Sequence, residues 1–268
     1  MYSKFNYTPG PLYNPEINGH LEKGSGLYSD ASEKARKCLE DFIYKNGDIN
    51  GSALQAHWFK SIDADVFISH SHNDINKAKA LSGWLFDTFG LKSFIDSCVW
   101  GYCNDLLQQI DDKYCKNSDE KTYNYQLRNY TTSHVHIMLS TALTEMIDKT
   151  ECILFINTPE SITLGNEIHD IKEKGAETNS PWIYHELAMT TMVQQTEPVR
   201  KRQISESKFE ASSKIPTFDY HVEKYLRNMT SLSDYDLNNW KIYCQKNNLH
   251  ENHSLDGLYL IKGFIKKT

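Results

Sequence analysis

The chain has 268 residues and a formal net charge of −6 at pH 7, with 39% hydrophobic and 12% aromatic residues. This length can bury a core without disulfides or a structural metal, and the aromatic content is not that of a disordered chain. The negative charge excludes a global basic field for holding nucleic acid or an anionic membrane, so neither partner is expected.

No segment of the sequence has the length and apolarity of a membrane anchor. The longest fully apolar run is Cys152–Ile156, far short of the roughly 20 residues of a spanning helix. The first residues, Met1–Tyr7, lack the apolar core of a signal peptide. We therefore expect a cytoplasmic protein. Its six cysteines form no CxxC pair, so they are interpreted as free thiols, and no metal site is expected.

The N-terminal part of the chain is expected to be an extension. Residues 1–29 are rich in Gly, Pro, Asn and Tyr and show no period, which predicts an arm. Helical spacing of apolar residues predicts one helix at 31–46, ended by Gly47, and a second at 52–60. Residues 1–62 are thus predicted to be an N-terminal arm and helical extension.

The rest of the chain alternates short apolar runs with helical patterns. Strands are expected at 65–69, 91–96, 152–156 and 215–222; helices at 75–89, 104–111, 133–148, from Ser180-Pro181 onward, and at 226–247; and a long polar, Tyr-rich loop at 112–131. This alternation predicts an α/β fold with an open, doubly wound, flavodoxin-like and mostly parallel sheet over 63–247, followed by a C-terminal tail at 248–268.

In such folds ligands bind beyond the carboxyl ends of the strands, and polar and aromatic residues gather there. The first predicted strand ends at Ser69, His70 and Ser71, and the second ends at Asp96, with Trp100 in the loop that follows. A later helix carries Trp182 and Glu186, which lie one turn apart on one face.

Each of these residues also has a purely structural interpretation. Asp96 can cap a turn, Trp182 can belong to the core, and Glu186 can lie on a solvated helix face. The loop with Trp100 is expected to be exposed and to use Gly101 as a hinge, which predicts a gate that also mediates self-association.

Three segments, Asp65–Ser69, Ser93–Asp96 and Ser180–Glu186, resemble in order and spacing the motifs of a Toll/interleukin-1 receptor (TIR) domain. The resemblance covers residues 63–247 and is greatest to the standalone bacterial TIR proteins of Thoeris antiphage defence. It implies cleavage of NAD⁺ at the nicotinamide–ribose bond, with Glu186 as the catalytic residue. NAD⁺ is then the substrate, and no further cofactor or metal is implied.

The chemistry fits what the sequence offers. Nicotinamide leaves as a neutral molecule from a cationic pyridinium, so it needs no general acid, and one carboxylate can stabilise an oxocarbenium-like transition state. Ser69, His70, Ser71, Asp96, Trp100 and Trp182 are the expected substrate-binding residues.

The resemblance also predicts partners. We expect a homo-oligomer on activation, a separate effector protein reached through an ADP-ribose-derived signal, cyclic or conjugated, and a phage-derived trigger as a candidate. The alternative is a non-enzymatic TIR scaffold that acts through homotypic association. A response-regulator receiver is disfavoured, because His70 and Asn157 stand where its acids would be, and a deoxyribosyltransferase-like enzyme stays open.

Overall fold

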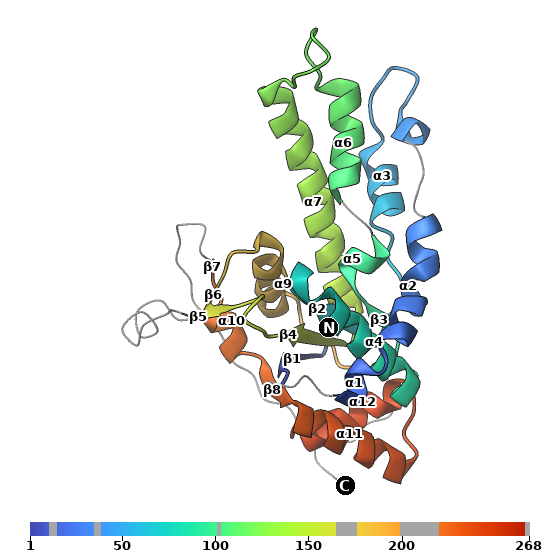
Figure 1. Cartoon of the computed structure of the whole chain (residues 1–268), viewed down its shortest axis with the longest axis vertical. Coiled ribbons are helices and arrows are strands. Elements are labelled where there is room, and N and C mark those ends of the chain that lie inside the picture. The colour runs from blue at the N-terminus through green and yellow to red at the C-terminus, as the bar shows by residue number, and fades with distance from the viewer. Residues whose placement is uncertain (11–14, 35–38, 101–102, 165–175, 199–219, 266–268) are drawn as a thin grey trace. The chain divides into compact units, whose positions relative to one another are not determined.

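The computed structural model describes residues 1–10, 15–34, 39–100, 103–164, 176–198 and 220–265 (Figure 1). Contacts divide the chain into two compact units. We call Met1–Leu27, Asp63–Ile95 and Ile147–Thr268 the sheet unit, and Tyr28–Ile62 with Asp96–Met146 the helical unit. Each unit is described by itself.

Within the described residues, the sheet unit is built on a five-stranded sheet in the order β3-β2-β4-β1-β8. Every pairing in it is parallel. Its strands are β1 (Ser3–Thr8), β2 (Val66–Ser69), β3 (Ser93–Phe94), β4 (Cys152–Ile156) and β8 (Thr230–Ser233). The α/β class and the parallel sheet are therefore confirmed, and the arrangement is consistent with a flavodoxin-like fold.

The expected N-terminal arm is wrong for residues 3–8, because β1 lies inside the sheet. Phe5 is the register partner of Leu154 in β4 on one side and of Thr230 in β8 on the other. The Phe5 and Tyr7 side chains are fully buried, whereas Lys4 and Asn6, which alternate with them along the strand, are half-buried. Burial of these alternate residues places a strand where the composition had predicted a loop.

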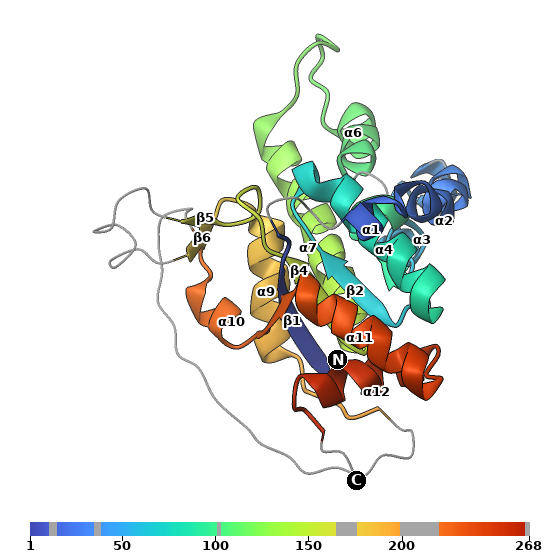
Figure 2. The ribbon, with the colours of Figure 1, turned by 60° about the horizontal axis from the view of Figure 1, so that its bottom comes forward.

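Helices cover both faces of this sheet. The Phe5 ring stacks on Tyr259 of α12 (Asn252–Ile261), with 6.5 Å between ring centroids. Next along the strand, the Lys4 ammonium donates to the Thr190 carbonyl of α9 (Pro181–Met192) at 2.9 Å. Because successive side chains of a strand point to opposite faces, α9 and α12 lie on opposite sides of the sheet (Figure 2).

The helix expected at 31–46 is displaced toward the N-terminus. The structure has α2 at Leu21–Lys34 and a short 3-10 helix, η1, at Leu39–Phe42. Gly24 lies inside α2, and a Cβ there would come 1.8 Å from the Lys79 carbonyl oxygen of α4. The glycine therefore permits close helix packing and does not mark a loop.

In the helical unit, the long loop that the sequence predicted at 112–131 is replaced for much of its length by helices. Helix α6 runs to Tyr114, and α7 begins at Tyr125. Between them a tight turn is closed by a bridge between Lys116 and Tyr123. Asn124 starts α7, because its side-chain oxygen accepts from the next free backbone N–H groups of the helix.

The remaining elements follow the predictions in type more than in extent. The predicted strands at 65–69 and 152–156 and the helices at 52–60, 75–89 and after Ser180 are confirmed. The predicted helix at 226–247 is interrupted by β8, and the predicted tail contains α12. The further elements are α1 (Pro15–Asn18), α3 (Gly51–Trp58), η2 (His72–Asp74), α4 (Ile75–Phe89), α5 (Asp96–Val99), α6 (Cys103–Tyr114), α7 (Tyr125–Lys149), α10 (Glu223–Arg227) and α11 (Asp234–Asn247).

A small antiparallel sheet lies apart from the parallel one. It contains β5 (Thr163–Leu164), β6 (Ala176–Thr178) and β7 (Tyr220–His221), in the order β5-β6-β7. β7 corresponds to the end of the strand predicted at 215–222. Residues 215–219, like Gly101, lie outside the described part of the chain.

None of the helices in the described part of the chain is long and apolar enough to cross a membrane.

Candidate active site

The connections of the sheet unit define where a ligand would bind. From β2 the chain continues into α4, whose Phe89 ring stacks on Trp240 of α11 at 4.0 Å. From β4 it continues toward α9, which covers the Lys4 face. The connections that follow β2 and β4, two neighbouring parallel strands, thus run to different helical layers. Crevices at such a switch point, outside the carboxyl ends of the strands, are the usual ligand sites of open α/β sheets.

At this edge the structure joins two of the predicted site residues directly. The Ser69 hydroxyl, at the end of β2, donates to Glu186 Oε2 of α9 at 2.5 Å. Both residues are buried, with exposed fractions of 2% and 5%. Ser180 caps α9 by accepting from the Ile183 N–H at 3.3 Å, and Pro181 occupies the first turn, as the sequence predicted.

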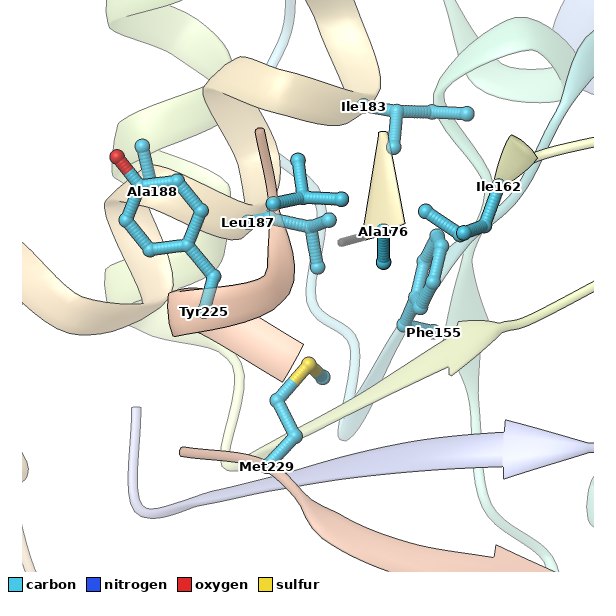
Figure 3. Packing of buried hydrophobic residues seen from close by; sticks show 9 residues of the cluster. Phe155, Ile162, Ala176, Ile183, Leu187, Ala188, Tyr225 and Met229 are labelled. Carbon is cyan, nitrogen blue, oxygen red and sulfur yellow. The ribbon is translucent and has the colours of Figure 1, made fainter. Parts of the chain in front are cut away.

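An apolar cluster, shown in Figure 3, includes residues of α9 that neighbour Glu186 along the helix. Ile183 and Leu187, on either side of Glu186 along α9, belong to it, and so does Phe155 of β4. Phe155 is the register partner of Ser69, so the two side chains share one face of the sheet. The carboxylate therefore lies beside a surface that excludes water, where its electrostatic interactions are stronger than in solvent.

A second set of hydrogen bonds, which the sequence did not reveal, ties the loops after β2 and β4 together. The Thr158 hydroxyl donates to Asp74 Oδ2 at 2.5 Å, and the Lys77 ammonium donates to the other oxygen of the same carboxylate at 2.5 Å. Nearby, the Asn73 amide donates to Glu160 at 2.7 Å. The only sequence signal was the polar turn after the first strand, and burial of Asp74 depends on tertiary packing.

Three other predicted residues lie at the same edge. His70 directly follows Ser69 and is 9% exposed, and Ser71 is half-buried, with its carbonyl accepting from the Asp74 N–H at 2.8 Å. Trp182 is half-buried and lies one turn before Glu186 on the same face of α9. Their roles as substrate contacts stay predictions.

Asp96 and Trp100 belong to the helical unit. Asp96 begins α5 and is half-buried, and its carbonyl accepts from the Trp100 N–H at 2.9 Å. Trp100 is only 3% exposed; its indole N–H donates to the Lys60 carbonyl at 2.9 Å, and its ring meets Phe59 edge-on at 5.6 Å. The expectation of an exposed gating Trp100 is therefore wrong, because the ring is part of the packing of this unit.

Comparisons with protein-family models, with curated proteins and with solved structures gave no match. Among the described residues, no group of three or more His, Cys, Asp and Glu side chains could hold a metal ion.

The class that the fold defines is an α/β protein with a parallel sheet and a polar cluster at its switch point. A buried carboxylate beside an apolar wall can stabilise a developing positive charge, and an ordered hydroxyl can fix its orientation.

Proposed function

We propose that this chain is a TIR-type enzyme that cleaves the nicotinamide–ribose bond of NAD⁺. The observation that carries the proposal is the buried Glu186 carboxylate, held by the Ser69 hydroxyl at the carboxyl edge of the parallel sheet. The TIR assignment in this proposal comes from the order of the three sequence motifs. The position of Glu186 at the switch point of the sheet supports its role as the catalytic residue.

The reaction needs little more than this carboxylate. As the C–N bond breaks, nicotinamide departs with the bonding electron pair and the ribose carbon becomes cationic. Glu186 then stabilises that cation, and a carboxylate oxygen can also accept from a ribose hydroxyl. Water, a second part of the same nucleotide or another nucleophile then takes the ribosyl cation, which gives a linear, cyclised or conjugated product.

Ser69 has a different role in this proposal from the one that the sequence predicted. Its hydroxyl carries one proton, and the structure directs that proton to Glu186. Ser69 is therefore a positioning residue that fixes the carboxylate, while His70, Ser71 and Trp182 remain the substrate contacts. We leave Trp100 out of the substrate site because its ring is buried against Phe59.

We further propose that the product is a signal in antiphage defence, released to a separate effector protein after a phage-derived trigger activates the enzyme. The support is the resemblance to the standalone Thoeris TIR proteins. A signalling role requires a product other than plain ADP-ribose, or an effector that responds to the product.

The test is to incubate concentrated protein with NAD⁺, measure nicotinamide release, and identify the nucleotide product by mass spectrometry. We expect release by the wild-type chain and almost none by Glu186→Gln. Absence of release even at high protein concentration, with the protein folded and supplied with phage lysate, would contradict the enzyme and favour the non-enzymatic scaffold.

A further inference from the structure

Two exposed side chains form a bridge across the switch point of the sheet. The Asn73 amide, in the loop after β2, donates to Glu160 Oε2, in the loop after β4, at 2.7 Å. Both residues are exposed, and the strands that precede them, β2 and β4, lie side by side in the sheet (Figure 2). The bridge therefore lies at the rim of the crevice in which open α/β sheets bind their ligands.

The backbone that carries Glu160 is held by buried hydrogen bonds. Thr158 is 8% exposed; its hydroxyl donates to the buried Asp74 carboxylate and accepts from the Glu160 N–H at 3.2 Å. The Thr158 N–H in turn donates to the buried Ser161 hydroxyl at 2.9 Å. Glu160 is thus an exposed side chain on a fixed stretch of backbone, so little conformational entropy is lost when it binds a ligand.

The Glu160 carboxylate carries an uncompensated negative charge at this rim. The neighbouring Asp74 carboxylate is neutralised by the Lys77 ammonium at 2.5 Å. Among the described residues, in contrast, no cation pairs with Glu160, and its second oxygen, Oε1, accepts no hydrogen bond. A carboxylate with one oxygen held and the other open accepts from ligand hydroxyl groups and repels a ligand phosphate.

We propose that Glu160 binds the adenosine ribose of NAD⁺ and selects NAD⁺ against NADP⁺. This inference rests on the proposed function, which places the other ribose, next to nicotinamide, at Glu186. The adenosine ribose of NAD⁺ presents a 2′- and a 3′-hydroxyl, and both donate to acceptors. In NADP⁺ the 2′-hydroxyl is replaced by a phosphate of about −2 charge, which the carboxylate repels. Acidic side chains at the crevice of dinucleotide-binding sheets make the same choice.

The position of the bridge favours the adenosine end of the dinucleotide over the nicotinamide end. Ser69 and Phe155 are register partners at the carboxyl edge of the sheet, and Ser69 holds the buried Glu186. Asn73 and Glu160 follow these two strand residues along the chain and are exposed. The reacting bond belongs at the buried carboxylate, so the half of the dinucleotide that does not react extends toward the exposed rim.

The first test compares NAD⁺ with NADP⁺ by nicotinamide release from the full chain. The wild type should have a kcat/KM about 100-fold higher for NAD⁺, from one charged hydrogen bond gained and one like-charge contact avoided. Glu160→Gln keeps the volume and removes the charge. It should raise the KM for NAD⁺ about tenfold and lower the KM for NADP⁺, with kcat unchanged.

The matched control is Glu197→Gln, at an exposed position after α9, which should keep the full preference for NAD⁺. A wild type that uses both dinucleotides equally, or a Glu160→Gln variant with an unchanged preference, overturns the inference and leaves the proposed function intact.

A binding measurement separates this inference from the proposed function. ADP-ribose and its 2′-phosphate are each titrated by calorimetry into the wild type and into Glu160→Gln, so that no turnover is needed. The wild type should bind ADP-ribose at least tenfold more tightly, and the variant should lose most of that difference. If it does while no dinucleotide releases nicotinamide, the ribose site stands and the enzyme proposal fails. Equal affinities in the wild type, or no binding of either nucleotide, overturn the role of Glu160.

Discussion

Each of the two units contains a buried carboxylate, but their partners differ. In the helical unit, Asp111 is 4% exposed and accepts from the Arg128 guanidinium at 2.7 Å and from the Thr131 hydroxyl at 3.2 Å. In the sheet unit, Glu186 is similarly buried and accepts from the neutral Ser69 hydroxyl at 2.5 Å. A guanidinium partner neutralises a carboxylate and suits it to hold a structure, whereas a hydroxyl orients a carboxylate and leaves its charge in place.

We therefore expect changes in the helical unit to alter stability and changes at the sheet edge to alter catalysis. The largest expected effect is on stability. Trp100→Ala removes a buried indole and should cost about 3–5 kcal/mol of unfolding free energy. Thermal unfolding should show a melting temperature lower by roughly 10 °C. Trp100→Phe keeps the ring contact with Phe59 and should lose less. An unchanged melting temperature with activity lost would return Trp100 to the substrate site.

At the sheet edge the corresponding change is Glu186→Gln. It keeps the side-chain volume and an acceptor for Ser69 but removes the charge, so the barrier to nicotinamide release should rise by about 3–4 kcal/mol, at least 100-fold in rate. Circular dichroism should show an unchanged fold. Glu197→Gln, at an exposed position after α9, is the control and should retain full activity. Full activity of Glu186→Gln would refute the catalytic assignment.

A smaller effect tests the other carboxylate. Asp111→Asn loses its charge-assisted bond to Arg128 and should cost about 1–3 kcal/mol in denaturant unfolding, with the activity of the folded fraction unchanged. Its neighbour Asp112 lies at the surface with Lys116 at 3.2 Å, where solvent screens the ion pair, so Asp112→Asn should cost clearly less stability than Asp111→Asn. Equal losses from the two variants would show that burial of Asp111 contributes nothing.

The smallest effect separates positioning from substrate binding. Ser69→Ala frees the carboxylate to reorient, and kcat should fall about tenfold with KM little changed, corresponding to about 1.4 kcal/mol. Ser69→Thr keeps the hydroxyl and should restore part of the rate. Ser71→Ala, in contrast, should raise KM. If Ser69→Ala raises KM at constant kcat, Ser69 contacts the substrate as the sequence first suggested.

Local patterns predicted much of the sheet unit. The continuous apolar runs at β2 and β4 and the cap at Ser180 are readable without tertiary information, and they assigned Ser69 and Glu186 to the same candidate site; the contact between the two side chains came only from the structure. Local patterns could not reveal the helices and strands that form only because other parts of the chain pack against them. Gly24 is helical because α4 approaches it closely, and β1 contains Lys4 and Asn6 on a face that only the fold covers.

The helical unit was harder to predict for the same reason. Trp100 stood next to a glycine in a short polar segment, which indicates an exposed loop, and its partners Phe59 and Lys60 lie far away in the sequence. The second half of the Tyr-rich segment forms the first turns of α7, because Asn124 caps the helix and Arg128 binds Asp111 of α6. Contacts between residues far apart in the sequence leave no mark on the local hydrophobic periodicity from which the elements were predicted.

The place of β1 in the sheet has a consequence for synthesis on the ribosome. This strand is synthesised before every other strand of the sheet, yet its neighbours are β4 and β8, and the second of these begins at Thr230. At about 5–20 residues per second, roughly ten to forty seconds pass before β8 exists. During that time Phe5 and Tyr7 have no completed sheet to enter. The parallel sheet can therefore close only late in translation, and the nascent chain depends on chaperones or on its own solubility until then.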